Sequence, residues 1–366
     1  MQDPNCGSRH HCGRQYSSCR IVPDSTATDL QNEFRETIMK LYFAPMEGIT
    51  GYVFRNAYAA CYGGIDTFFT PFLSNPVLNH IEKGDILPEH NAGLHVVPQI
   101  LTNRPDTFVA IAETLKDYGY REVNLNLGCP SGTVVAKGRG SGALREPKEL
   151  DRLLDEIYTR SPLPVSVKTR IGIRSDVEWE DILDVFRKYP VTELIIHPRV
   201  QKQFYKGEVF MDAYKEAYDS LTPLPAPGPA ASTLLCYNGD IRTPEDADRI
   251  MTEYPRTNAL MLGRGLLWDP ELGERILRSS AAGSDVFSSG QQPGKSPDLP
   301  RLRRFLNLLY EGYLEEMDRE GPALMKLKEL WSYLKLYASL SDADMRPLWK
   351  TKTLAEYRDV VNMLLR

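Results

Sequence analysis

Residues 107–168 alternate between two hydrophobic patterns: TFVAIAETLKDY (107–118), EVNLNL (122–127), LDRLLDEIYT (150–159) and PVSVK (164–168). In the first and third segments, apolar residues recur at three- and four-residue spacing, which is typical of an amphipathic helix. The second and fourth segments are short, and Val or Leu alternates with other residues in them, which is typical of strands. This alternation of strands and helices indicates a parallel sheet.

The same alternation extends over residues 40–278. Six further strands are predicted at Leu41–Ala44, Thr67–Phe69, Leu94–Ile100, Glu193–His197, Thr233–Tyr237 and Ala259–Leu262. Further helices are predicted at Trp179–Lys188, Met211–Tyr218, Pro244–Glu253 and Pro270–Arg278. Eight strands over about 240 residues predict a closed (β/α)8 TIM barrel, an α/β fold. An open, doubly wound sheet is the alternative, which the strand count disfavours.

The composition changes after residue 278. Residues 279–299 are rich in Ser, Gly, Gln and Pro and are predicted to form a linker. Leu302–Met317, Ala323–Leu340 and Leu354–Leu365 then carry apolar residues at helical spacing. We therefore predict a small C-terminal helical domain at residues 300–366, after a barrel at residues 40–278.

The charge balance limits the classes of partner. The 366 residues include 44 Lys and Arg against 49 Asp and Glu, a net charge of −5, whereas residues 300–366 carry 12 basic and 10 acidic side chains. Overall acidity argues against a protein that is basic over its whole surface, as many non-specific nucleic-acid binders are. A local basic face is compatible with it.

Residues 1–39 read as a disordered leader. Cys6, Cys12 and Cys19 stand near two histidines, but their spacing differs from the paired cysteines of a zinc knuckle, so we predict no metal site. No apolar stretch of a secretory signal or of a membrane span is present. Six cysteines in a chain of this length do not indicate a disulfide framework. We expect a cytoplasmic monomer.

Polar residues or glycine follow seven of the eight predicted strands, at the end where a barrel gathers its catalytic groups. These residues are Glu47 after the first strand, Gln99, Asn126 and Cys129, Lys168 and Arg170, His197 and Arg199, Asn238, Gly239 and Asp240, and Gly263 and Arg264. This concentration at one face predicts a functional site there.

Glycine turns follow the last two strands, as Asn238-Gly239-Asp240 and Gly263-Arg264-Gly265. Barrels commonly bind phosphate with the loops at these two positions, where backbone N–H groups face the anion. Either turn alone also fits an ordinary loop. Together, with the positive charge of Arg264, they predict a phosphate-bearing cofactor.

Lys168 and Cys129 each have two interpretations. Lys168 closes a strand at the barrel mouth, where it either pairs with a neighbouring acid or neutralises an anion such as the N1/C2=O edge of a reduced flavin. Cys129 lies on a turn between Gly128 and Pro130. It is a candidate general acid, because its thiol stays mostly protonated at neutral pH, or a nucleophile with His197 as its base.

Six motifs, taken in order along the chain, resemble those of the tRNA-dihydrouridine synthases. They are APMEGIT (44–50), NLGCPS (126–131), VKTR (167–170), HPR (197–199), NGDI (238–241) and GRG (263–265). Related FMN barrels share several of them, and the discriminating combination is NLGCPS with the helical tail. The resemblance covers residues 41–278 and, more loosely, the C-terminal helices.

The resemblance implies FMN-dependent reduction of the C5=C6 bond of a uridine in the D-loop of tRNA, with NADPH (or NADH) reducing the flavin. It implies that Cys129 protonates C5. Pro45, Met46, Gln99, Lys168 and His197 would contact the flavin, and Asn238, Gly239, Asp240, Gly263 and Arg264 its phosphate. Asn126 would position the base, while Arg170, Arg199, Lys326, Lys328 and Lys335 would meet RNA.

Two other functions fit the same residues. An FMN barrel acting on a free pyrimidine would share the strand-end motifs but would not need the helical domain. A non-catalytic RNA-binding protein that kept the barrel would bind tRNA without a flavin.

Overall fold

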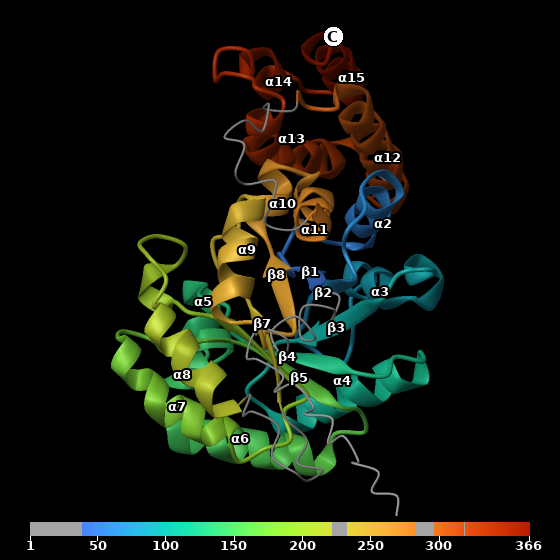
Figure 1. The fold of residues 1–366 in the computed structure, drawn as a ribbon. Coiled ribbons are helices and arrows are strands. Elements are labelled where there is room, and N and C mark those ends of the chain that lie inside the picture. Colours follow the sequence, from blue (N-terminus) through green and yellow to red (C-terminus); the bar gives the residue numbers. More distant parts are fainter. Residues whose placement is uncertain (1–38, 222–232, 283–295, 318) are drawn as a thin grey trace, which may run out of the picture. The chain divides into compact units, whose positions relative to one another are not determined.

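The computed structural model describes residues 39–221, 233–282, 296–317 and 319–366 (Figure 1). The Cys/His-containing leader and most of the predicted linker lie outside these residues. Helix α11 (Leu272–Ala282) continues through residues 279–282, which the sequence assigned to the linker.

Eight parallel strands close into a barrel in sequence order, with β1 hydrogen-bonded to β8, and confirm the predicted fold. The strands are β1 (Lys40–Phe43), β2 (Thr67–Leu73), β3 (Val96–Ile100), β4 (Val123–Leu127), β5 (Val165–Arg170), β6 (Glu193–His197), β7 (Leu234–Tyr237) and β8 (Ala259–Leu262). Strand β2 is longer than predicted, because its ladder continues past Pro71 through a register shift between Phe69 and Phe72.

Two apolar layers hold the barrel together. Inside it, a cluster that includes Tyr42, Phe69, Ile195 and Met261 fills the interior between the strands. The opposite strand faces pack against the surrounding helices in a larger core. Because the interior is filled by side chains, a ligand has access at the strand ends rather than through the middle.

The helices between the strands begin with the signals visible in the sequence. Pro105, Pro147 and Pro244 each stand in the first turn of a helix, where a missing N–H costs nothing. These helices are α4 (Pro105–Asp117), α6 (Pro147–Arg160) and α9 (Pro244–Glu253), and the others around the barrel are α2 (Tyr52–Cys61), α3 (His80–Ile86), α5 (Gly132–Val135), α7 (Trp179–Phe186), α8 (Met211–Leu221) and α10 (Arg264–Trp268). Helices α2, α3, α5 and α10 were not predicted.

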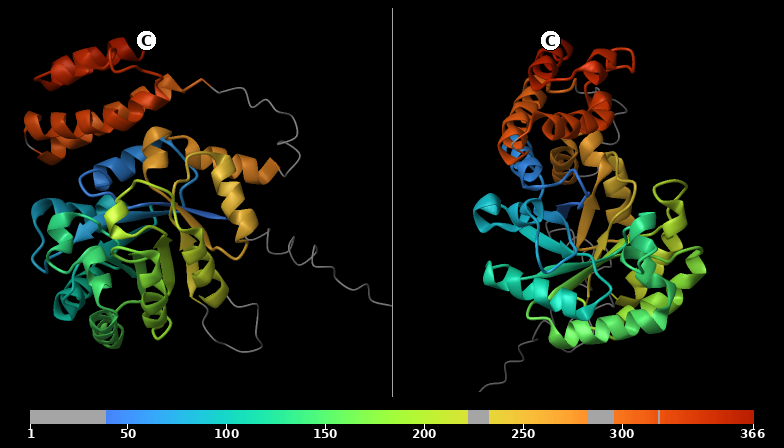
Figure 2. Two further views of the ribbon diagram at one scale, coloured as in Figure 1. Left: turned by 90° about the vertical axis from the view of Figure 1, so that its left-hand side faces the viewer. Right: turned by 180° about the vertical axis from the view of Figure 1, so that it is seen from behind.

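The C-terminal helices are α12 (Leu299–Met317), α13 (Glu320–Tyr337), α14 (Arg346–Lys350) and α15 (Leu354–Leu364). They lie beside α2, α10 and α11, as the two further views show (Figure 2). The rings of Phe305 on α12 and Phe54 on α2 meet edge to face with centroids 5.6 Å apart. Gly312 lies so close to Val53 that a Cβ at residue 312 would stand 2.6 Å from a Val53 methyl group. Barrel and tail thus share one continuous apolar core.

Polar contacts support this junction. Arg301 on α12 forms ion pairs with Glu271 and with Glu274 of α11. In the described part of the chain, no helix is long and apolar enough to cross a membrane.

Candidate active site

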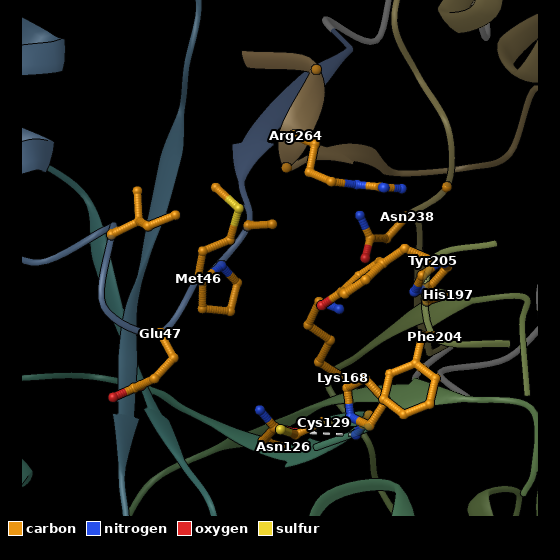
Figure 3. A pocket seen from close by; sticks show the side chains of 18 of the residues that line it. Met46, Glu47, Asn126, Cys129, Lys168, His197, Phe204, Tyr205, Asn238 and Arg264 are labelled. Atoms are coloured by element: carbon orange, nitrogen blue, oxygen red, sulfur yellow. Dashed lines mark hydrogen bonds between the residues drawn. The ribbon is translucent and has the colours of Figure 1, made fainter. Parts of the chain in front are cut away.

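A cavity of about 700 Å³ opens at the C-terminal ends of the strands. Its walls include nearly all of the strand-end residues that the sequence singled out, among them Pro45, Met46, Gln99, Asn126, Cys129, Lys168, Arg170, His197, Asn238, Gly239, Asp240, Gly263 and Arg264. Figure 3 shows Met46 on one side and His197 and Asn238 on the other, with Cys129 and Asn126 below them. The barrel therefore brings together residues spread over more than 200 positions of sequence.

A chain of buried amides runs across the floor of the cavity. Asn126 Nδ2 donates to Gln99 Oε1 over 2.7 Å, and Gln99 Nε2 donates to Asn124 Oδ1 over 2.8 Å. Asn124 Nδ2 in turn donates to Ser166 Oγ over 2.9 Å. Each amide is oriented by the next, so the floor presents fixed donors and acceptors.

Asn126 also holds the turn that carries Cys129. Its Oδ1 accepts hydrogen bonds from the backbone N–H groups of Gly128 and Cys129, over 3.0 and 2.9 Å. The Asn126 side chain therefore positions the thiol. The sequence predicted instead that it positions the base, and that role stays a prediction.

Replacing Asn126 with alanine is expected to slow any step that depends on the position of the Cys129 thiol by about 10²-fold, the cost of misplacing a reacting group by about 1 Å. Single-turnover rates of the purified protein measure this effect. Ser166→Ala is the matched control, because Ser166 ends the same amide chain without touching the Cys129 turn. Equal effects of the two substitutions would contradict the positioning role.

The thiol of Cys129 is half-buried and protonated. Burial raises its pKa, and this outweighs the opposing effect of a backbone hydrogen bond with Ser131; of the smaller charge effects, Glu47 raises the pKa and Arg170 and Lys168 lower it. Its backbone oxygen accepts hydrogen bonds from the N–H and the hydroxyl of Ser141. A fixed, protonated thiol at a cavity wall can act as a general acid.

Gly140 fits closely behind this turn. Its φ is +55°, and a Cβ there would stand 2.8 Å from Cys129 O and 2.9 Å from Cys129 Cβ. Gly140→Ala is expected to lower the free energy of unfolding by more than Gly93→Ala, as measured by denaturant titration. Gly93 has a φ of +81° but open space around it, so that variant carries only the backbone cost of about 1–2 kcal/mol. Equal costs would show that the contact with Cys129 is unimportant.

Lys168 has no carboxylate partner among the described residues. Burial lowers its pKa to about 8, Arg170 contributes to the shift, and the opposing effects come from the Cys236 and Cys129 thiols, with no carboxylate among them. The structure therefore disfavours the ion-pair interpretation of Lys168. An ammonium held at a cavity wall without a counterion is a site for an anion.

The two glycine turns present unpaired backbone donors. Among the described residues, the N–H groups of Gly239 and Asp240 have no hydrogen-bond partner. Those of Arg264 and Gly265 stand in the first turn of α10, where the helix offers no acceptor. A Cβ on Gly265 would lie 2.3 Å from Ile241 O, so the two turns approach closely without side chains between them.

Arg170 makes its hydrogen bonds within the protein. It is 1% exposed, its Nε donates to Gly128 O over 3.0 Å, and its Nη atoms donate to the backbone oxygens of Val200 and Phe204. The guanidinium thus ties the Cys129 turn to the loop after β6, and its contact with RNA stays a prediction. Burial lowers its pKa to about 10.

Arg199 is buried and pairs with the partly exposed Asp240. Arg199 is 1% exposed and donates to Asp240 Oδ1 over 3.1 Å and to Gly207 O over 2.6 Å. Asp240 also pairs with Arg264 over 3.3 Å. The guanidinium of Arg199 thus has partners within the protein, and its contact with RNA stays a prediction. The Asp240 carboxylate faces arginines and would repel a phosphate, so only its backbone N–H suits the predicted role.

His197 is buried and uncharged. Burial lowers its pKa well below the ordinary value, and the positive charges of Arg170, Lys168, Arg199 and Arg264 add to the effect. A neutral imidazole and a thiol of raised pKa do not form the thiolate–imidazolium pair of a nucleophilic cysteine. These protonation states therefore favour a proton donor at Cys129 over a nucleophile.

Aromatic residues at the cavity rim were missed by the sequence reasoning. Phe204 and Tyr205 follow β6 in QKQFYKG, and they are 46% and 51% exposed. Arg264 lies between the rings of Tyr205 and Trp268, at 4.7 and 5.3 Å from their centroids. Tyr333 of α13 completes the wall. The signal in the sequence was a pair of aromatic residues in a polar segment after a strand, which would have indicated a binding surface at the cavity.

The three lysines predicted to face RNA each have a partner within the protein. Lys326 Nζ donates to Gly48 O over 3.1 Å, beside the first strand-end loop. Lys328 caps the end of α14 through Trp349 O and Thr351 O, and Lys335 pairs with Asp342. None of the three lines the cavity, and their contact with RNA stays a prediction.

Comparison with known proteins identifies the family of the chain. The family model described as "Dihydrouridine synthase (Dus)" matches residues 42–288. A probable tRNA-dihydrouridine synthase of Staphylococcus aureus (strain Mu50) is 30% identical over 333 residues, which are 87% of this chain and 91% of the relative. The corresponding Staphylococcus epidermidis (strain ATCC 12228) protein is 28% identical over 346 residues, covering 91% and 96%.

A third relative, tRNA-dihydrouridine synthase B of Pasteurella multocida, is 30% identical over 236 residues, which are 64% of this chain and 67% of the relative. The match of the family model spans the barrel and all the strand-end motifs described above. The chain belongs to the dihydrouridine synthase family of enzymes.

Proposed function

We propose that this enzyme reduces the C5=C6 bond of a D-loop uridine in tRNA to 5,6-dihydrouridine, with FMN as cofactor and NADPH as the source of electrons. The observation that carries the proposal is a protonated thiol at the wall of the same cavity that holds an unpaired ammonium, Cys129 and Lys168. The names of the relatives support tRNA as the substrate.

The residues present fit a flavin phosphate ester. The Lys168 ammonium lacks a counterion, and the N–H groups of Gly239, Asp240 and Gly265 lack acceptors. Donors of both kinds line one cavity, so an elongated anion can satisfy all of them at once. When bound, reduced FMN supplies the hydride that C6 of the uracil ring accepts.

Cys129 supplies the proton for C5. Its raised pKa keeps the thiol protonated at neutral pH, and Asn126 fixes the turn on which it stands. Loss of the proton leaves a thiolate, which Lys168 and Arg170 stabilise through their positive charges until a proton from water restores the thiol. Hydride and proton together reduce the double bond.

The uridine must leave its stack to reach the cavity. That step costs a few kcal/mol and less in a loop than in a duplex. The exposed rings of Phe204 and Tyr205 at the rim provide surfaces on which an extruded base can stack.

The test combines cells and purified protein. Mass-spectrometric mapping of tRNA from cells lacking this protein should show one or more missing dihydrouridines, restored by the wild-type gene. Purified protein with FMN and NADPH should form dihydrouridine in an unmodified tRNA transcript. Reduction of free uracil or orotate without tRNA would favour a free-pyrimidine oxidoreductase, and tRNA binding without flavin binding would favour a non-catalytic RNA-binding protein.

A further inference from the structure

The hydrogen bond between His197 and Arg199 identifies which ring nitrogen of the histidine carries the proton. Arg199 Nη1 lies 3.1 Å from His197 Nε2. A guanidinium has N–H donors and no acceptor. Nε2 must therefore be the unprotonated nitrogen of the ring, and a neutral imidazole in this position carries its proton on Nδ1.

Arg199 is itself held in one orientation. Its Nη1 also donates to Asp240 Oδ1 over 3.1 Å, and its Nη2 donates to the other Asp240 oxygen and to Gly207 O. The arginine is 1% exposed, and Asp240 faces it with a carboxylate whose pKa Arg199 holds below its ordinary value, although burial acts in the opposite direction. A buried guanidinium fixed at three acceptors cannot turn away from the imidazole.

The remaining N–H of the ring is free. His197 is 7% exposed and lines the cavity, and among the described residues its Nδ1 has no hydrogen-bond partner. The ring of Tyr205 lies over the imidazole with centroids 6.2 Å apart and an interplanar angle of 26°, which limits rotation of the ring. An N–H donor on a cavity-lining residue is available to an acceptor of a bound ligand.

We propose that Arg199, oriented by Asp240, is a positioning residue that fixes His197 as the neutral Nδ1–H tautomer, so that His197 presents a donor to a carbonyl or phosphate oxygen bound in the cavity. The identity of that ligand as the flavin rests on the proposed function. The tautomer itself does not, because it follows from contacts within the chain. This assignment replaces the RNA-phosphate role that the sequence suggested for Arg199.

The tautomer is measured directly by long-range ¹H–¹⁵N correlation spectra of full-length protein with ¹⁵N-labelled histidine. The chain has six histidines, and His197→Gln identifies the signals of His197 by their loss. The flavin-free wild type is expected to show a protonated Nδ1 and an unprotonated Nε2. A protonated Nε2 with an unprotonated Nδ1, or a doubly protonated ring, at neutral pH would overturn the proposal whatever the variants do.

Arg199→Met removes the donor and should shift the signals toward the Nε2–H tautomer. The Kd for FMN should rise about tenfold, as expected when one buried hydrogen bond is lost. Arg264→Met is the control for the tautomer, because Arg264 shares Asp240 with Arg199 and makes no hydrogen bond to His197. Full retention of the Nδ1–H tautomer in Arg199→Met would contradict the proposal.

The salt dependence of tRNA binding and the activity of the wild type distinguish a positioning role of Arg199 from a contact with RNA phosphate. If Arg199 contacted an RNA phosphate, Arg199→Met would reduce the slope of log K for tRNA against log salt by about one, whereas we expect an unchanged slope. Dihydrouridine formation is scored separately in the wild type. Failure of that activity with the expected tautomer would remove the proposed function and leave the role of Arg199 standing.

Discussion

Cys129→Ala is expected to lower the rate of dihydrouridine formation by about 10²–10⁴-fold, the usual contribution of a positioned general acid. The substitution removes the thiol that donates the proton and leaves the rest of the cavity intact. The backbone of residue 129 keeps its hydrogen bonds to Asn126 and Ser141. Flavin affinity should therefore stay within about threefold of the wild-type value.

The measurement is a single-turnover reaction of pre-reduced protein with excess tRNA, followed by mass spectrometry of the product. Cys61→Ala is the matched control, since Cys61 is also a free cysteine but ends α2, outside the cavity. Its rate should equal that of the wild type. Unimpaired turnover by Cys129→Ala would show that the proton for C5 comes from another group.

Lys168→Met should raise the Kd for FMN by roughly thirtyfold or more, corresponding to the loss of about 2 kcal/mol from a buried charge contact. The side chain is half-buried and has no carboxylate partner among the described residues, so its ammonium is available to an anion. Fluorescence titration of the flavin-free protein measures this affinity.

The same lysine predicts a pH dependence. In the free protein, burial lowers its pKa to about 8, and a bound anion would raise it again. FMN affinity should therefore be constant below pH 8 and fall toward tenfold per pH unit above it, as the free ammonium loses its proton. Lys168→Arg keeps its charge and should bind FMN with little dependence on pH between 7 and 10. An identical fall in Lys168→Arg and in the wild type would exclude Lys168 as its origin.

The strands were predictable because each is a short segment in which apolar residues are consecutive or alternate with other residues. Strands β6 and β8 have the predicted bounds, and their residues are buried throughout. The predicted strand ends at Phe69, two residues before Pro71, which cannot donate to a ladder. The observed strand β2 continues to Leu73 through a register shift between Phe69 and Phe72. Helix α2 has no polar side chain that caps its N-terminus, so the start signals that identify α9 are absent from it.

The position of the candidate site was predictable from topology, whereas the direction of its charged side chains was not. A parallel barrel sends every strand end to one face, which placed Asn126, Cys129 and Lys168 together. The same rule cannot tell whether an arginine faces ligand or folds back. Arg170 and Arg199 fold back because the loop after β6 offers the backbone oxygens of Val200, Phe204 and Gly207, and these contacts are set by tertiary structure.

Because α12 and α2 share one continuous core, the barrel is not expected to be stable without the C-terminal helices. The tail covers an apolar surface of the barrel, because Gly312 packs against Val53 and Phe305 packs against Phe54. A barrel expressed without residues 299–366 would expose that surface to water and should aggregate. The barrel and the tail should therefore melt in a single transition. Tyr333 on α13 then stays at a fixed distance from the strand ends.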